Sequence, residues 1–143
     1  MLLDPTAPMT ARGQRFVIYG LVGLCAEVFF TSIVGFVRGR DRRLIGQTSL
    51  WMFPIYGLIE PLYEPLHDAL REPLPAAGRG LVYGLGFLAV EYLSGRLLRA
   101  VLGEAPWDYS HARPHLHGLI RLDYLPLWAG AGLALERLHD RLT

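Results

Sequence analysis

The chain has 143 residues, of which 52% are hydrophobic and 19% charged, and its formal net charge is +1 at pH 7. This length fits one domain, and the small charge gives no support to a nucleic-acid-binding protein. Cys25 is the only cysteine, which excludes an intrachain disulfide and a thiolate metal site. The hydrophobic residues form separate runs with polar residues between them, a pattern that indicates an integral membrane protein.

The first apolar run covers residues 16–37 and follows a polar lead, residues 1–14, that contains Pro5 and Pro8. A helix of about 22 residues is long enough to cross ~30 Å of hydrocarbon. The run is too long for the core of a signal peptide and carries Glu27. We therefore expect it to be a retained transmembrane helix.

The second predicted span, residues 49–66, follows an arginine-rich loop at residues 38–43. Pro54, Pro61 and Pro65 interrupt this span, and each proline removes a backbone hydrogen-bond donor. A broken or bent helix is the expected result. The density of positive charge in the loop favours its placement on the cytoplasmic side.

Two further spans are predicted at residues 80–102 and 118–138. The small-residue run 129–132 in the last span suits close helix contact. The predicted fold is thus all-α: a polytopic membrane protein with about four transmembrane helices in a single integral membrane domain, residues 1–143. The alternative is a soluble helical bundle, but apolar runs this uniform would leave it almost no amphipathic faces to present to water.

The two halves of the chain resemble each other. Tyr19 precedes Glu27 by the same number of residues as Tyr83 precedes Glu91, and each tyrosine is followed by Gly-Leu. Three later positions also align in order: Gly46 with Gly118, Pro54 with Pro126, and Tyr56 with Trp128. The sequence therefore predicts two parallel helix-pair repeats. Chance similarity among residues common in membrane helices is the alternative.

Three glutamates lie near the middle of predicted spans, where a charged side chain costs roughly 2.5–3.5 kcal/mol. Arginines near the helix ends offer cationic partners. One interpretation is an ion-pair network that fixes helix register, and the other is a polar cavity that binds a substrate or an ion. The candidate site residues are Glu27, Glu60, Glu91, Arg96, Arg121 and Asp123.

The loop before the fourth span contains Trp107, Asp108 and Tyr109. Tryptophan and tyrosine are typical of the membrane interface, and an aspartate here is suited to cap the following turn. His111 and His115 lie farther along this loop, but Pro114 argues against the helix that would place them on one face. We therefore predict no metal site and no cofactor.

With these motifs laid out, the chain resembles the family that joins the bacterial ABC-transporter type IV (CmpB-like) permeases with the eukaryotic transmembrane protein 229 group. The resemblance covers nearly the whole chain. It is carried by the central glutamate of the third span and by four segments: CAEVFFT (25–31), QTSLWMFPIYG (47–57), PWDYS (106–110) and GLIRLDYLPLW (118–128). It implies a small polytopic membrane protein, without a catalytic residue that transfers to this chain.

Three functions remain open. The first is a transport- or lipid-related protein of the bacterial inner membrane that takes a lipid or a small anionic substrate. The second is a membrane-embedded enzyme in which a buried carboxylate acts as general base. The third is a non-catalytic accessory subunit. Since the chain has no nucleotide-binding loop, an ABC-type role requires a separate ATPase subunit, and four helices would have to form a homo-oligomer to build a permease core.

Overall fold

The computed structural model describes residues 11–39 and 41–143. Most of the polar lead, including Pro5 and Pro8, and Arg40 of the arginine-rich loop lie outside these described residues. The described chain is mostly helical, which agrees with the predicted all-α class. It divides into two compact units, Met1–Leu62 and Tyr63–Thr143, and each is described by itself.

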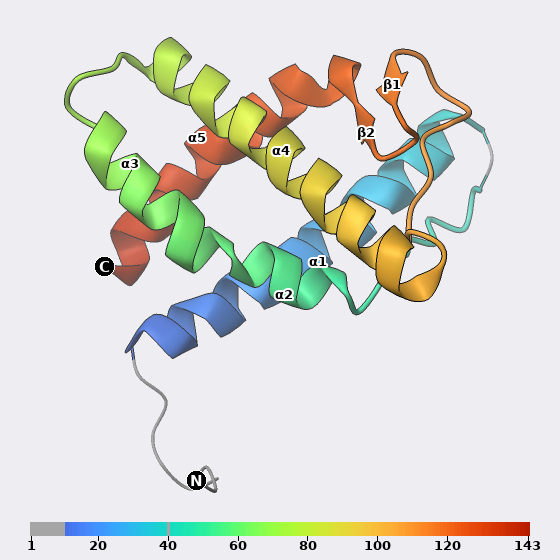
Figure 1. Cartoon of the computed structure of the whole chain (residues 1–143), viewed down its shortest axis with the longest axis horizontal. Coiled ribbons are helices and arrows are strands. Elements are labelled where there is room, and N and C mark those ends of the chain that lie inside the picture. Colours follow the sequence, from blue (N-terminus) through green and yellow to red (C-terminus); the bar gives the residue numbers. More distant parts are fainter. Residues whose placement is uncertain (1–10, 40) are drawn as a thin grey trace, which may run out of the picture. The chain divides into compact units, whose positions relative to one another are not determined.

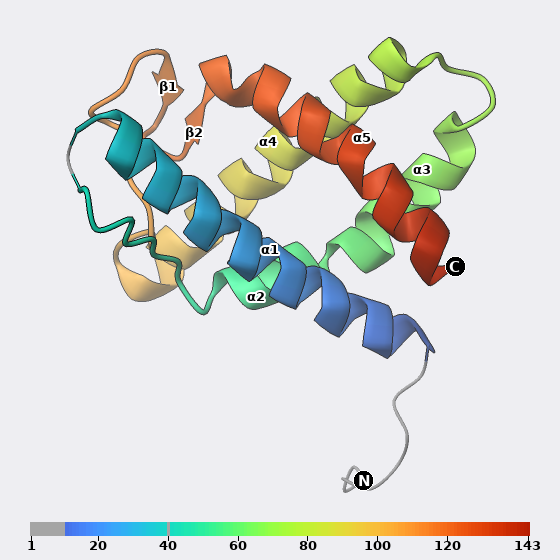
Figure 2. The same ribbon diagram turned by 180° about the vertical axis from the view of Figure 1, so that it is seen from behind.

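The first unit is built on α1 (Ala11–Val37) and α2 (Met52–Gly57), which lie side by side (Figure 2). Two glycines of α1 allow the close approach: Gly20 faces the ring of Phe53 and Gly23 faces Tyr56. A Cβ atom on Gly20 would lie 2.7 Å from the Phe53 ring. The helix pair therefore depends on small residues at its crossing.

The second predicted span is broken, as its prolines indicate. It consists of α2, a π-helical turn η1 (Ile59–Tyr63) and α3 (Glu64–Leu70). Pro61 lies inside the π-helical turn and Pro65 lies in the first turn of α3. A proline is tolerated in the first turn of a helix because the N–H that it lacks would have no partner within the helix there. A π-bulge is a common response where a proline disturbs the ladder of helical hydrogen bonds.

The second unit is built on α4 (Ala76–Leu102) and α5 (Leu125–Leu142), which pack against each other (Figure 1). Gly84 of α4 lies against Leu125, and Gly132 of α5 lies against the Tyr83 side chain. The predicted close contact at the small-residue run is thus confirmed for Gly132. In Figure 1, α3 runs beside the C-terminal end of α5.

The predicted fourth span begins too early at residue 118. Instead, β1 (His115–Leu116) and β2 (Ile120–Arg121) form an antiparallel pair, followed by a 3-10 turn, η2 (Leu122–Tyr124), before α5. Gly118 has φ +70° in the connecting turn, a conformation that glycine adopts without strain. The apolar residues that suggested a helix here are buried by the hairpin: Leu119 is fully buried and Ile120 is 6% exposed.

Two described helices, α1 and α4, are long and apolar enough to cross a membrane. Their large apolar side chains are widely exposed: Phe29 and Val37 on α1, and Leu93 and Val101 on α4, are 65–75% exposed. The other two predicted spans do not form such a helix in the described residues. One is broken by prolines, and α5 carries four charged residues in its second half. Apolar exposure on this scale marks a surface that another apolar phase or protein covers.

Candidate functional site

In the first unit, two predicted site residues have polar partners. Glu27 accepts a hydrogen bond from the Tyr56 hydroxyl (3.0 Å) and also bonds the Thr48 side chain. Glu60, which is 7% exposed, forms an ion pair with Arg12 at the start of α1. Both carboxylates are therefore held between α1 and the segment that follows it.

In the second unit, Glu91 is 9% exposed and accepts a hydrogen bond from the Tyr109 hydroxyl at 2.9 Å. Arg96 donates to the hydroxyl of Tyr92 at 3.3 Å and lies over its ring. Arg96 lies five positions after Glu91, so a helix turns them to different faces. A tyrosine hydroxyl is thus a described partner of each of the two central glutamates, Glu27 and Glu91.

Three predicted residues are linked through two tyrosines. The ring of Tyr109 packs edge-on against Tyr124 (6.0 Å between centroids), and Arg121 donates to the Tyr124 hydroxyl at 3.2 Å. Arg121 also forms a 2.7 Å ion pair with Asp123. We call these five residues the Glu91 group: Glu91, Tyr109, Arg121, Asp123 and Tyr124.

Two of the three predicted residues of the PWDYS loop hold it against the rest of the second unit, and Asp108 forms hydrogen bonds within the loop. Trp107 donates its indole N–H to the Leu119 carbonyl at 2.9 Å, and Tyr109 reaches Glu91 as described above. Asp108 accepts the backbone N–H of Ser110 at 2.9 Å and its hydroxyl at 2.8 Å. Asp108 thus forms two hydrogen bonds inside the loop, at the start of the turn that follows it, and the two aromatic side chains make specific contacts.

Asp108 gives the loop a pH dependence. The backbone N–H and hydroxyl of Ser110 hold the pKa of Asp108 below its ordinary value near 3.8. A lowered folded-state pKa stabilises the fold above the unfolded-state pKa, and this stabilisation is lost as pH falls through the folded-state value. We expect Asp108→Asn to lower the unfolding temperature at pH 7. We also expect the unfolding temperature of this variant to fall less than that of the wild type when the pH is lowered below ~4.

Thermal unfolding of the detergent-solubilised protein from pH 7 to pH 2.5 measures this effect. Glu104→Gln, at an exposed position of the same loop, is the matched control and should keep the wild-type pH profile. Parallel profiles for the wild type and Asp108→Asn would contradict the assignment.

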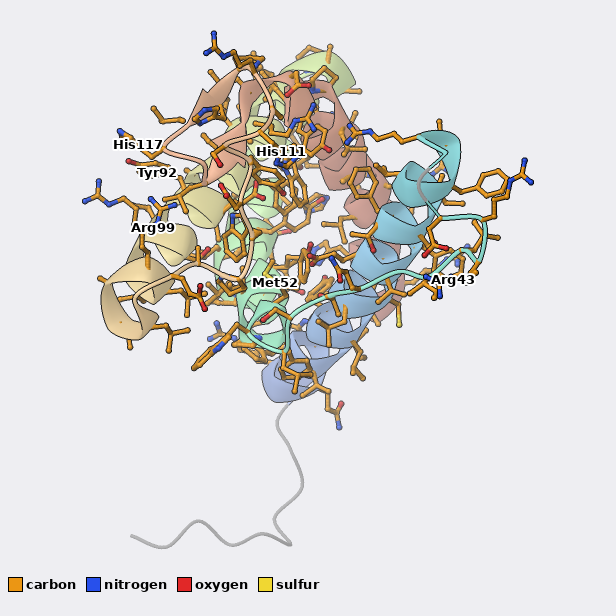
Figure 3. The ribbon with its side chains drawn as sticks, turned by 90° about the vertical axis from the view of Figure 1, so that its right-hand side faces the viewer. Arg43, Met52, Tyr92, Arg99, His111 and His117 are labelled. Atoms are coloured by element: carbon orange, nitrogen blue, oxygen red, sulfur yellow. The ribbon has the colours of Figure 1, made fainter. Side chains whose placement is uncertain are left out.

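The histidine-rich loop is tied to α4 on the side shown in Figure 3. Tyr92 and the His117 ring hydrogen-bond at 2.8 Å, and Arg99 donates to the His117 carbonyl at 2.9 Å. His115 accepts the backbone N–H of Gly118. These histidines therefore hold the loop in place.

A second buried polar group, unexpected from the sequence, joins α3, α4 and the second half of α5. We call it the polar cluster, and its members are Tyr63, Glu64, His67, Asp68, Arg71, Arg79, Tyr83, Glu136, His139 and Asp140. Four of its ionisable side chains are less than 8% exposed: Glu64, His67, Glu136 and His139.

Glu136 is the centre of one half of this cluster. Arg79 donates two parallel hydrogen bonds to its carboxylate, at 2.9 and 3.0 Å, and the Tyr83 hydroxyl donates a third at 2.9 Å. Arg71 also lies 3.6 Å from the same carboxylate. Bidentate pairing with arginine is the strongest common form of carboxylate recognition, so this contact joins the start of α4 to α5 firmly.

The two histidines form the other half. His67 and His139 are 4% and 5% exposed, and their ring centroids lie 4.5 Å apart. Each ring lies between carboxylates: His67 contacts Asp68 (3.0 Å) and approaches Glu136 (3.7 Å), while His139 approaches Glu64 (3.3 Å) and Asp68 (3.4 Å). Such a group can bind protons or a cation.

The sequence contains a signal for this cluster that hydropathy hides. Glu64, His67 and Arg71 are spaced by three and four residues, and Glu136 is followed by His139 and Asp140 at three and four residues, which places ionisable groups on one helix face. Glu64 and Glu136 lie at the ends of the predicted spans 49–66 and 118–138, and the other members lie just beyond them. Hydropathy alone therefore does not indicate that the two sets meet.

The family described as "Putative ABC-transporter type IV" matches residues 14–143. No solved structure matches the chain. The match includes all four helical segments of both units and the motifs of the PWDYS loop, in agreement with the resemblance noted from the sequence. The chain therefore belongs to the "Putative ABC-transporter type IV" family.

Proposed function

We propose that this protein is a small polytopic protein of the bacterial inner membrane that binds and transfers an anionic lipid or a small anionic amphiphile. Its membrane character is supported by the transporter-type family and by the two long apolar helices, α1 and α4. In this proposal the polar intramembrane site of the second unit is formed by the Glu91 group, which contains the predicted residues Glu91, Arg121 and Asp123.

The proposed architecture is a pair of parallel helix-pair repeats. In the register of the sequence repeat, Gly20 corresponds to Gly84 and Phe53 corresponds to Leu125. Gly20 contacts Phe53 in the first unit, and Gly84 contacts Leu125 in the second. Equivalent positions thus make equivalent helix contacts, which supports the proposed repeat.

Two more pairs support the same register. Gly23 contacts Tyr56 in the first unit, and the corresponding Phe87 stacks on Trp128 in the second with ring centroids 5.1 Å apart. The tyrosines at equivalent positions, Tyr19 and Tyr83, are both almost completely buried. Each long helix thus buries the corresponding face within its own unit. Glu27 and Glu91 then occupy corresponding depths.

The Glu91 group is the observation that carries the functional proposal. Arg121 has a side chain only 11% exposed, whereas its partner Asp123 is 41% exposed. Arginine offers a planar fork of donors that matches carboxylate and phosphate groups. An anionic headgroup that replaces the Asp123 carboxylate would keep Arg121 neutralised, while the hydroxyls of Tyr109 and Tyr124 supply further hydrogen bonds.

The test is binding and transfer of anionic lipid by the purified protein in vesicles. The protein is reconstituted in phosphatidylcholine vesicles that contain fluorescent phosphatidylglycerol or fluorescent phosphatidylcholine, and the transfer of each probe between leaflets is followed by chemical quenching. We expect faster transfer of phosphatidylglycerol, reduced at least about tenfold by Arg121→Gln, since a charge-assisted pair contributes about 1.5–3 kcal/mol.

Arg137→Gln is the matched control, because Arg137 is an exposed arginine of α5. It should transfer the anionic probe at the wild-type rate. Equal transfer of both probes, or an unchanged rate in Arg121→Gln, would contradict the proposal. Recovery of the protein in the soluble fraction after alkaline carbonate treatment would contradict its membrane character.

A further inference from the structure

We infer that the histidine half of the polar cluster is a binding site for a divalent transition-metal ion of the zinc type. The proposed ligands are His67 Nδ1, Asp68 Oδ1 and His139 Nε2. Each of the three residues offers one ligand atom within 4.8 Å of those of the other two, although they come from two helices far apart in the sequence. This inference does not depend on the lipid-binding proposal, because it involves none of the residues of the Glu91 group.

Two of the three distances between the proposed ligand atoms suit such an ion, and the His67 and His139 rings would close around it on binding. Asp68 Oδ1 lies 3.0 Å from His67 Nδ1 and 3.4 Å from His139 Nε2. Ligands placed tetrahedrally around zinc at about 2.0–2.1 Å are separated from one another by about 3.4 Å. Two imidazole nitrogens and one carboxylate oxygen are a ligand set that zinc uses in sites with an open fourth position.

The nitrogens that face away from the proposed ion have carboxylates behind them. His139 Nδ1 lies 3.3 Å from Glu64 Oε1, and His67 Nε2 lies 3.7 Å from Glu136 Oε2. A carboxylate that accepts the second N–H of a ligating histidine is a recurrent feature of metal sites, because it fixes the ring and raises its basicity. His139 has this support from Glu64, whereas Glu136 lies beyond hydrogen-bond distance of His67 Nε2.

One contact changes when the ion binds. Arg71 Nη1 lies 3.0 Å from His67 Nε2, so in the metal-free arrangement this nitrogen accepts a hydrogen bond. With a metal on Nδ1, the proton of neutral His67 moves to Nε2 and faces Glu136. Arg71 keeps partners without His67, since it also lies 3.3 Å from Asp140 and 3.6 Å from Glu136.

The charges of the cluster favour a divalent cation. Four carboxylates face two guanidinium groups, so with neutral histidines the cluster carries two net negative charges: Glu64, Asp68, Glu136 and Asp140 against Arg71 and Arg79.

The site also has a route to solvent. The Asp68 side chain is 69% exposed, whereas the His67 and His139 side chains are each 6% exposed. An ion would therefore enter on the Asp68 side and be held against two buried rings. In that position it would link α3 to the C-terminal turn of α5.

The experiment uses the full-length protein in detergent after removal of metals by a chelator. Zn²⁺ is titrated by calorimetry into the wild type, His67→Gln, His139→Gln and His111→Gln. We expect one Zn²⁺ per chain in the wild type, with affinity at least about tenfold weaker in the first two variants. His111→Gln, which alters an exposed histidine of the loop, should bind as the wild type does.

Zinc X-ray absorption on the wild-type protein provides a test that needs no variant to fold. Two imidazole ligands and a carboxylate oxygen at about 2.0–2.1 Å would support the site. Absence of saturable Zn²⁺ binding, a spectrum with fewer than two imidazoles, or full affinity in both folded histidine variants would overturn it.

Discussion

Gly132→Leu is expected to lower the unfolding temperature of the protein by about 10 °C. A side chain at this position would occupy the space of the Tyr83 ring, which is almost completely buried where α5 crosses α4. Overpacking of a tight interior costs about 1–3 kcal/mol. A shift of α5 would also weaken the 2.7 Å hydrogen bond from the Tyr63 hydroxyl to the Gly132 carbonyl, a further loss of about 1 kcal/mol.

Gly130→Leu is the matched control for this prediction. Gly130 lies on the same helix two residues earlier, and no atom lies within 4 Å of a Cβ atom built there. Because leucine has a higher helix propensity than glycine, this variant should be neutral or more stable by up to about 1 kcal/mol. Similar unfolding temperatures for the two variants, measured by circular dichroism in detergent, would refute the packing of α4 on α5 described here.

Glu136→Ala is expected to lower the unfolding temperature by about 5–10 °C. The Glu136 carboxylate receives the two parallel hydrogen bonds of Arg79 and the hydroxyl bond of Tyr83. Removal of one member of a buried ion pair leaves its partner desolvated and uncompensated, so the loss exceeds the contribution of the pair itself. The measurement is thermal unfolding in detergent at neutral pH.

Two further variants test whether the lower unfolding temperature of Glu136→Ala comes from loss of the buried ion pair. Glu136→Gln keeps the size and one acceptor for Tyr83, and we expect it to fall between the wild type and Glu136→Ala. Glu104→Ala removes an exposed carboxylate and should change the unfolding temperature by no more than about 2 °C. An effect of Glu136→Ala no larger than that of Glu104→Ala would show that the bidentate pair does not stabilise the second unit.

Helix positions were predictable where they depend on the hydropathy of a short segment or on a proline within it. The long apolar helices α1 and α4 and the break at Pro61 follow from residues close together in the chain. The start of α5 did not follow, because Leu119 and Ile120 are apolar enough to be read as helix. Their burial in a short hairpin depends on α4, Trp107 and the turn at Gly118.

The candidate site was predictable only in part, for a related reason. Glu27 and Glu91 were identified because a lone carboxylate in an apolar run is costly and requires a partner. Their described partners, Tyr56 and Tyr109, could not be named, because they lie 29 and 18 residues away along the chain. Which hydroxyl reaches which carboxylate depends on how the helices pack.

Local composition, spacing and motifs were enough to predict the family, the apolar helices, the broken second span, and Glu27 and Glu91 as glutamates inside apolar runs. The tertiary structure alone decided that Glu64 and His67 of α3 meet Glu136 and His139 of α5. Each of these residues is an ordinary polar residue at the end of an apolar run. Only the packing of α3 beside α5 removes them from water and makes their charges depend on one another.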